Sequence, residues 1–199
     1  MELAYQGEIL TGSECGRMDQ VCAYGEVPVF LTFDGNDMQV EQLFPQSPLY
    51  FVVVDLKAGK DTKRILADLN HYFMNGHKKL RDRLRYALGY GNAQILSKAR
   101  RAIIKGDGKT VGFLMNEAQV VFDQLVAPIC PAELTAPKLH RVLSYSPIQE
   151  LIWGGKGVGS QGDGSAQFVA KGPEEQDEIC RRLDTLDVDC FKFTIQAAL

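Results

Sequence analysis

One uninterrupted apolar run, LYFVVVDL at residues 49–56, constrains the fold of this chain more than any other stretch. The run is rich in β-branched and aromatic residues, and it lacks the polar alternation of a half-exposed strand. Such a run is typical of a strand that is buried on both faces. With 45% hydrophobic residues among 199, the chain can bury a core around it, as one large domain or two small ones.

The elements around this strand predict an α+β fold. Residues 28–33 and 38–44 are expected to form a hairpin, with a turn at Asp34, Gly35 and Asn36. From Asp61, a candidate N-cap, the apolar period becomes helical. Strands and helices do not alternate as a repeating βαβ array, which favours α+β. The other expected elements are helices at 1–10, 79–88, 93–104, 111–126, 136–144 and 174–186, and strands at 165–170 and 188–195.

Cysteine usage and charge narrow the class of protein. Five cysteines without a C-x-x-C pair argue against a disulfide framework and a structural zinc site, and they fit a reducing cytoplasm. No hydrophobic run is long enough to span a bilayer, and the N-terminus lacks a leader pattern. Residues 77–105 carry nine Lys or Arg against one acid, and residues 173–189 carry seven acids against two Arg. These segments are solvated helix faces, or the basic one steers an anionic substrate. The net charge of −3 disfavours a nucleic-acid partner.

The first stretch with chemical potential is EILTGSECGRMDQ, residues 8–20, in which Glu8 and Asp19 flank a loop containing Gly12 and Gly16. Two interpretations of the carboxylates remain open. Asp19 could cap a helix while Glu8 is a surface acid. Alternatively, one carboxylate accepts a proton and the other binds magnesium, because hard oxygen ligands hold this ion beside phosphates.

The second stretch is WGGKGVGSQGDGSAQF, residues 153–168, which predicts a glycine-rich loop before the strand at 165–170. Each glycine costs conformational entropy, so this density indicates a close backbone approach or positive φ angles. The stretch matches G-x-G-x-x-G, but that fingerprint must open a helix, whereas here a strand follows. A P-loop motif is absent from the sequence. A tight turn without a ligand is the alternative.

The third stretch is VVVDLKAGKDTKRIL, residues 52–66, where Lys57 and Lys60 lie between the buried strand and the helix that follows. A helix N-terminus with nearby lysines is suited to an anion. A solvated loop without a ligand is the simpler interpretation of the same residues.

Together these stretches resemble the GHMP small-molecule kinases, the superfamily of galactokinase, homoserine kinase, mevalonate kinase and phosphomevalonate kinase. CGRMDQ, residues 15–20, resembles the galactokinase-type sequence around the catalytic aspartate, and AYQGE, residues 4–8, is similar to the segment that ends in the magnesium-binding glutamate. GGKGVGSQGDG, residues 154–164, is similar to the third, glycine-rich motif. The resemblance covers nearly the whole chain.

The resemblance implies a set of functional residues and two cofactors, ATP and Mg²⁺. Asp19 would accept the proton of a substrate hydroxyl, Arg17 would support Asp19 or contact the substrate, and Glu8 would bind the metal. Substrate contacts are implied for Gly16, Gly155, Lys156, Gly157, Gly159 and Ser160, and ATP contacts for Gly12 and Ser13.

The sequence departs from the family pattern in two places. The family's second motif, which wraps the ATP phosphates, would precede Met1, so we expect a C-terminal portion that is inactive by itself. Gln161 and Asp163 replace the alanine or glycine that is common in the third motif. An acid would repel a nucleotide phosphate unless a metal ion or a basic group lay between them, so we expect Asp163 to face the substrate or to buttress the turn.

The resulting expectation is a galactokinase-like sugar kinase of the cytoplasm that acts on an anomeric hydroxyl. Residues 1–70 would form the rear of the N-terminal domain, including the hairpin and the buried strand, and residues 71–199 a ferredoxin-like C-terminal domain. The chain would self-associate or bind a partner that supplies the missing part, and it would bind neither membrane nor nucleic acid. The alternative is a non-catalytic GHMP-fold interaction module that has lost nucleotide binding.

Overall fold

The computed structural model describes residues 2–10, 17–18, 20–21, 25, 27–35 and 37–198. The chain forms two compact units, residues 1–44 and 45–199. The predicted boundary at residue 70 differs from this division. Strand β3 (Leu49–Asp55) is hydrogen-bonded to two strands near the C-terminus, and it therefore belongs to the second unit.

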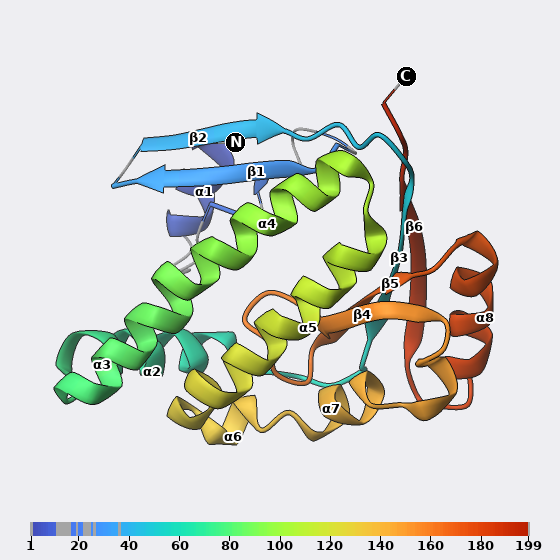
Figure 1. The fold of residues 1–199 in the computed structure, drawn as a ribbon. Helices are drawn as coiled ribbons and strands as arrows, with labels where there is room; N and C mark the ends of the chain where they lie inside the picture. Colours follow the sequence, from blue (N-terminus) through green and yellow to red (C-terminus); the bar gives the residue numbers. More distant parts are fainter. Residues whose placement is uncertain are drawn as a thin grey trace. The chain divides into compact units, whose positions relative to one another are not determined.

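The first unit contains helix α1 (Glu2–Leu10) and a β-hairpin made of β1 (Val29–Asp34) and β2 (Asp37–Gln42) (Figure 1). The antiparallel register runs from Val29 opposite Gln42 to Asp34 opposite Asp37. This register confirms the predicted hairpin. Gly35 in the turn has a φ of +57°, a conformation that glycine adopts without strain, and Asn36 lies outside the described residues.

The second unit is built on a four-stranded antiparallel sheet in the order β4-β5-β3-β6, with β4 (Ile152–Gly157), β5 (Ser165–Ala170) and β6 (Asp189–Ile195) (Figure 1). In chain order the unit reads as a strand, helices, two strands, a helix and a final strand. Its first and third strands lie in the middle of the sheet, which is the ferredoxin-like arrangement. This confirms the α+β class and the ferredoxin-like C-terminal domain.

Strand β3 is buried on both faces because each face of the sheet has its own core. Val52 and Val54 belong to a core with residues of α7 (Pro137–Leu143) and α8 (Pro173–Leu183). Leu49 and Phe51 belong to a second core with residues of α4 (Gly91–Lys105) and α5 (Gly108–Leu125). Successive side chains of a strand point to opposite faces, so the apolar run supplies both cores.

The predicted helices are present with small shifts at their ends. Helix α2 (Thr62–Asn75) begins after Asp61, whose carboxylate accepts a hydrogen bond from the Arg64 amide at 2.9 Å, as expected of an N-cap. The helix expected at 79–88 is α-helical only as α3 (Lys78–Arg85) and continues as a π-helical turn over residues 86–90. A short helix that was not predicted, α6 (Pro131–Leu134), precedes α7.

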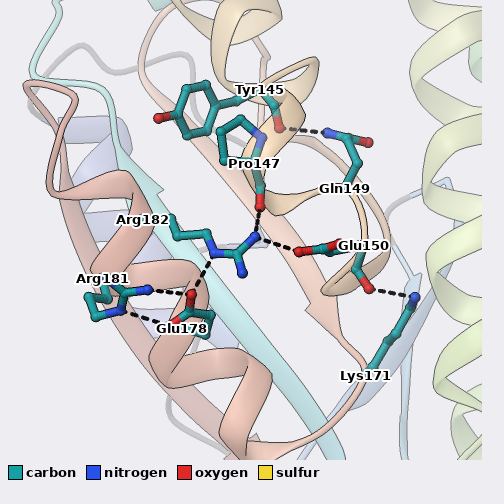
Figure 2. Close-up of polar contacts among 8 residues, drawn as sticks. All are labelled: Tyr145, Pro147, Gln149, Glu150, Lys171, Glu178, Arg181 and Arg182. Atoms are coloured by element: carbon teal, nitrogen blue, oxygen red, sulfur yellow. Dashed lines mark hydrogen bonds and ion pairs between the residues drawn. The ribbon is translucent and has the colours of Figure 1, made fainter.

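An ion-pair network fixes α8 to the segment before β4 (Figure 2). The Arg182 guanidinium donates to Glu178 at 2.6 Å, to Glu150 at 2.7 Å and to the Pro147 carbonyl oxygen. Arg181 also donates to Glu178, at 2.7 Å. The two guanidinium groups lower the pKa of Glu178 to about 2. Within the described ranges, no helix is both long and apolar enough to cross a bilayer.

Candidate functional site

The glycine-rich segment forms strand β4, a tight turn and the start of β5 (Figure 1). The prediction of a loop was therefore wrong for residues 153–157, which belong to β4; residues 154–157 pair with β5, and Trp153 lies at an irregularity in the register. The turn follows Gly157 and contains three left-handed residues, Gly159, Gln161 and Gly162, with φ of +60°, +66° and +75°. The Gln161 amide closes it by donating to the Val158 carbonyl oxygen at 3.1 Å.

Two glycines allow the backbone of α5 to lie directly against the backbone of β4. A β-carbon at Gly112 of α5 would lie 2.6 Å from the carbonyl carbon of Trp153, and one at Gly154 would overlap the Gly112 carbonyl group. Gly155 faces the Phe168 ring, which leaves no room for a side chain. The glycines inside β4 therefore serve close packing within the second unit.

Two side chains of α5 satisfy the free edge of β4. The Gly155 amide donates to Asn116 Oδ1 at 2.9 Å, and the Gly157 amide donates to Gln119 Oε1 at 2.8 Å. Gln119 is buried and donates in turn to Asp123 Oδ1 at 2.8 Å. Exposed strand edges attract other strands, and this pairing removes that hazard. Neither residue was predicted from the sequence, although their i, i+3 spacing places them on one helix face.

Two lysines donate to carbonyl oxygens beside the glycine turn. Lys156 Nζ lies 2.6 Å from the Gly157 oxygen, and Lys60 Nζ lies 3.4 Å from the Val158 oxygen. Burial disfavours a charged ammonium group, so it lowers the pKa of both lysines. The structure thus brings Lys60, from the segment before α2, to the turn together with the predicted Lys156.

Asp163 supports the turn by capping helix α7. Its Oδ1 accepts a hydrogen bond of 2.9 Å from the amide of Leu139, which lies in the first turn of that helix. A carboxylate at a helix N-terminus satisfies a donor that has no partner within the helix. Of the two roles left open for this acid, the geometry supports the buttress.

The groups around the N-terminus of α2 are engaged by acids. Lys57 forms ion pairs with Asp189 at 2.8 Å and Asp187 at 3.5 Å, and these acids raise its pKa. The Asp61 amide donates to Glu133 Oε2 at 2.9 Å. The positive end of the helix dipole and Lys57 are therefore already paired with carboxylates, which disfavours the anion site considered for this stretch.

A groove of about 420 Å³ lies between α5 and α7 above β4. Its polar lining includes Asn116, Gln119 and His140, and Trp153 supplies an aromatic surface. His140 Nε2 lies 3.6 Å from Asp123 Oδ1, so the groove ends at the side-chain network that reaches β4.

The predicted catalytic stretch is described only in part. Helix α1 contains position 8, whose side chain is outside the description, and Gly12, Ser13, Gly16 and Asp19 lie outside the described residues. The Arg17 guanidinium is half-buried and stacks on the Tyr5 ring of α1, 4.7 Å from its centroid. Arg17 thus contacts the helix that contains position 8. Among the residues that the structure describes, no group of three or more His, Cys, Asp or Glu could hold a metal ion.

Known proteins similar to this chain are found among solved structures, by fold. No family model and no curated protein matches the sequence. A mevalonate kinase from L. major, solved with R-mevalonate, matches 90% of this chain at a TM-score of 0.71 and 20% identity. A phosphomevalonate kinase from Streptococcus pneumoniae, solved with phosphomevalonate and AMPPNP, matches 94% at a TM-score of 0.70 and 14% identity.

A galactokinase from Lactococcus lactis, complexed with galactose, matches 96% of this chain at a TM-score of 0.65 and 13% identity. The chain spans about half the length of these structures, covering 52%, 58% and 56% of them in turn. Structural matches at identities this low show a shared fold and do not show which substrate a protein binds. Over most of its length, this chain has the fold of the GHMP kinases.

Proposed function

We propose that this chain carries the catalytic aspartate and the C-terminal lobe of an ATP-dependent small-molecule kinase whose substrate is a monosaccharide. The observation that carries the proposal is the fold shared with GHMP kinases over at least 90% of the chain. Residues 15–20 and 154–164 resemble the family's catalytic and glycine-rich motifs, in the family's order. The choice of a sugar is supported by the likeness of CGRMDQ to galactokinases.

In this proposal Asp19 accepts the proton of the substrate hydroxyl while that oxygen attacks the γ-phosphoryl group of ATP. Arg17 keeps the carboxylate ionised, because a nearby positive charge favours the charged form. A carboxylate at Glu8 is a suitable hard ligand for Mg²⁺, which, when bound, neutralises charge on the transferred phosphoryl group. Gly12 and Ser13 would contact ATP.

The glycine-rich segment would contribute to the substrate site in two ways. Gly159 and Ser160 lie in the turn that follows β4, where Gly159 is exposed and a β-carbon on it would meet no atom within 4 Å. The other proposed contacts, at Gly155, Lys156 and Gly157, lie on β4, where two backbone amides already bind α5. We therefore propose that β4 positions the turn and that the turn, with Gly16, contacts the sugar.

A mass-spectrometric assay with Mg·ATP tests the proposal on the complete kinase, in which this chain is joined to the part that carries the ATP-wrapping motif, because the chain by itself is expected to be inactive. The substrates are a panel of monosaccharides, mevalonate and phosphomevalonate. We expect a sugar phosphate, and Asp19→Asn should lower its rate about 100-fold to 10,000-fold, the usual loss on removing a general base. Asp34→Asn, in the exposed hairpin, is the matched control and should leave the rate unchanged. Turnover of mevalonate alone would refute the sugar, and equal rates for Asp19→Asn and the control would refute the role of Asp19.

A non-catalytic interaction module is the second candidate. It is favoured by the acids that already occupy Lys57 and the Asp61 amide. A thermal-shift screen separates the candidates, because a ligand at 100 times its dissociation constant stabilises a protein by about 2.7 kcal/mol. The module predicts no shift with Mg·ATP or any sugar and a stable complex with a protein partner, whereas the kinase predicts a sugar-dependent shift.

A further inference from the structure

Helix α8 and strand β6 are joined by paired side chains along their length. Gln176 of α8 donates to the Phe193 carbonyl oxygen at 2.9 Å, and Asp177 forms an ion pair with Lys192. Cys190 lies two residues before Lys192, so both side chains point to the same face of β6. That face is the one covered by α8.

The next pair along these two elements consists of two thiols. Cys180 lies one helical turn after Asp177, and the Cys180 and Cys190 side chains form a hydrogen bond to each other. Both cysteines are free thiols, both pack against the same core, and both remain partly exposed. The two thiols are thus neighbours on paired elements and are partly accessible to a small reagent.

We propose that Cys180 and Cys190 are an oxidation site that forms a reversible intrachain disulfide on contact with a low-molecular-weight disulfide. The thiolate of one cysteine attacks the small disulfide, which gives a mixed disulfide and releases one small thiol. The second cysteine then attacks the mixed disulfide and releases the other. Two protein thiols are oxidised, the small disulfide is reduced to two thiols, and these take up the two protons.

The local charges assign the order of attack. Burial and the neighbouring Cys180 raise the pKa of Cys190 to about 12, and Asp184 and Asp189 add smaller contributions in the same direction. Burial also raises the pKa of Cys180, but the hydrogen bond from Cys190 and the charge of Lys192 act in the opposite direction. Cys180 is therefore the attacking thiol and Cys190 the resolving one, and the reaction at neutral pH is slow because little thiolate is present. The charged groups that face the pair are Asp177, Asp184, Asp189 and Lys192.

The disulfide would join the C-terminal part of α8 to the start of β6 and close the loop of residues 180–190. A cross-link of this kind restricts the unfolded chain, so the oxidised protein should unfold at a higher temperature than the reduced one. The effect lies beyond the proposed kinase activity and does not depend on it.

Peptide mapping tests this inference directly. The protein is incubated with oxidised glutathione, quenched with N-ethylmaleimide and digested with trypsin, which cuts at Arg181 and Arg182 and so separates the two cysteines. We expect a cross-linked pair of peptides, two hydrogen atoms lighter than the free thiol peptides, that disappears on reduction. The thermal midpoint should rise on oxidation and return on reduction.

Three variants sharpen the test. Cys180→Ser and Cys190→Ser should each abolish the cross-link and the oxidation-dependent rise of the midpoint, and the midpoint of the reduced variants reports whether they fold. Cys130→Ser, in a separate buried cluster, should retain both effects. The inference is overturned if Cys180 and Cys190 of the wild type remain reduced and are both recovered alkylated by N-ethylmaleimide. It is also overturned if each carries glutathione without a cross-link, or if either cysteine pairs with Cys15 or Cys22.

Discussion

Replacing Gly112 by alanine tests whether the backbone of α5 lies directly against the backbone of β4. Two effects oppose each other at this position. Alanine is favoured over glycine in a helix interior by about 1 kcal/mol, so propensity alone predicts a more stable protein. The new β-carbon, however, would lie 2.6 Å from Trp153 atoms and 2.7 Å from the Gly154 amide nitrogen. Most of these neighbours are backbone atoms, which cannot rotate away.

The structure indicates that the clash wins. Overpacking of this kind costs about 1–3 kcal/mol. Moving α5 away from β4 would also strain the two hydrogen bonds that Asn116 and Gln119 accept from β4, and a buried amide without a partner costs about 1–3 kcal/mol. After subtraction of the helix propensity, we expect Gly112→Ala to lower the free energy of unfolding by about 1–5 kcal/mol.

Urea unfolding followed by circular dichroism measures this change. Gly108→Ala is the matched control in the same helix, because its β-carbon would meet only side-chain atoms, at 3.5 Å or more. We expect the control to change the free energy of unfolding by less than about 0.5 kcal/mol, as substitutions without a specific contact usually do. If Gly112→Ala proves as stable as Gly108→Ala, the backbone contact between α5 and β4 does not exist.

Three further predictions follow from the hydrogen bonds of the second unit. Asp163→Ala removes the acceptor of the Leu139 amide and should lower the free energy of unfolding by about 0.5–2 kcal/mol in the same assay, whereas Asp163→Asn should restore most of it. Gln119→Leu leaves the Gly157 amide without its acceptor and should cost about 1–3 kcal/mol, measured by urea unfolding and by faster hydrogen exchange at that amide. Glu178 has a folded-state pKa of about 2 against an ordinary value of 4.5, so its contribution to stability is present above pH 4.5 and lost as the pH falls toward 2. Glu178→Gln should therefore flatten the dependence of the thermal midpoint on pH within that window, and an unchanged slope would contradict the ion-pair geometry.

The sequence could predict the elements whose signals are local. The apolar run at 49–56, the turn at Gly35 and the N-cap at Asp61 each act within a few residues, and the structure contains the corresponding strand, hairpin and helix start. The domain boundary was beyond this kind of argument. The assignment of residues 49–55 depends on pairing with β5 and β6, more than 100 residues away, and no local pattern encodes that pairing.

The polar residues of α5 show a second limit. Asn116 and Gln119 could equally be solvent-facing residues of an amphipathic helix, because side-chain chemistry is the same in both settings. Their partners are two amides on the free edge of β4, and β4 itself was missed because Gly154, Gly155 and Gly157 disfavour a strand in any propensity scale. Strand β4 and the two polar residues of α5 were missed for one reason. The close approach of α5 requires glycine in β4, and the same helix supplies the acceptors for the β4 amides.

The glycine-rich segment therefore combines two uses of glycine that a sequence pattern cannot separate. Both require the absence of a β-carbon, one for packing inside the fold and one for a left-handed turn that a ligand can approach. The space around each residue distinguishes them. Gly154 and Gly155 have no room for a β-carbon, whereas Gly159 has a φ of +60° and open space around it. The structural use of the first two explains part of the glycine density, so the case for a ligand contact rests on Gly159, which is exposed.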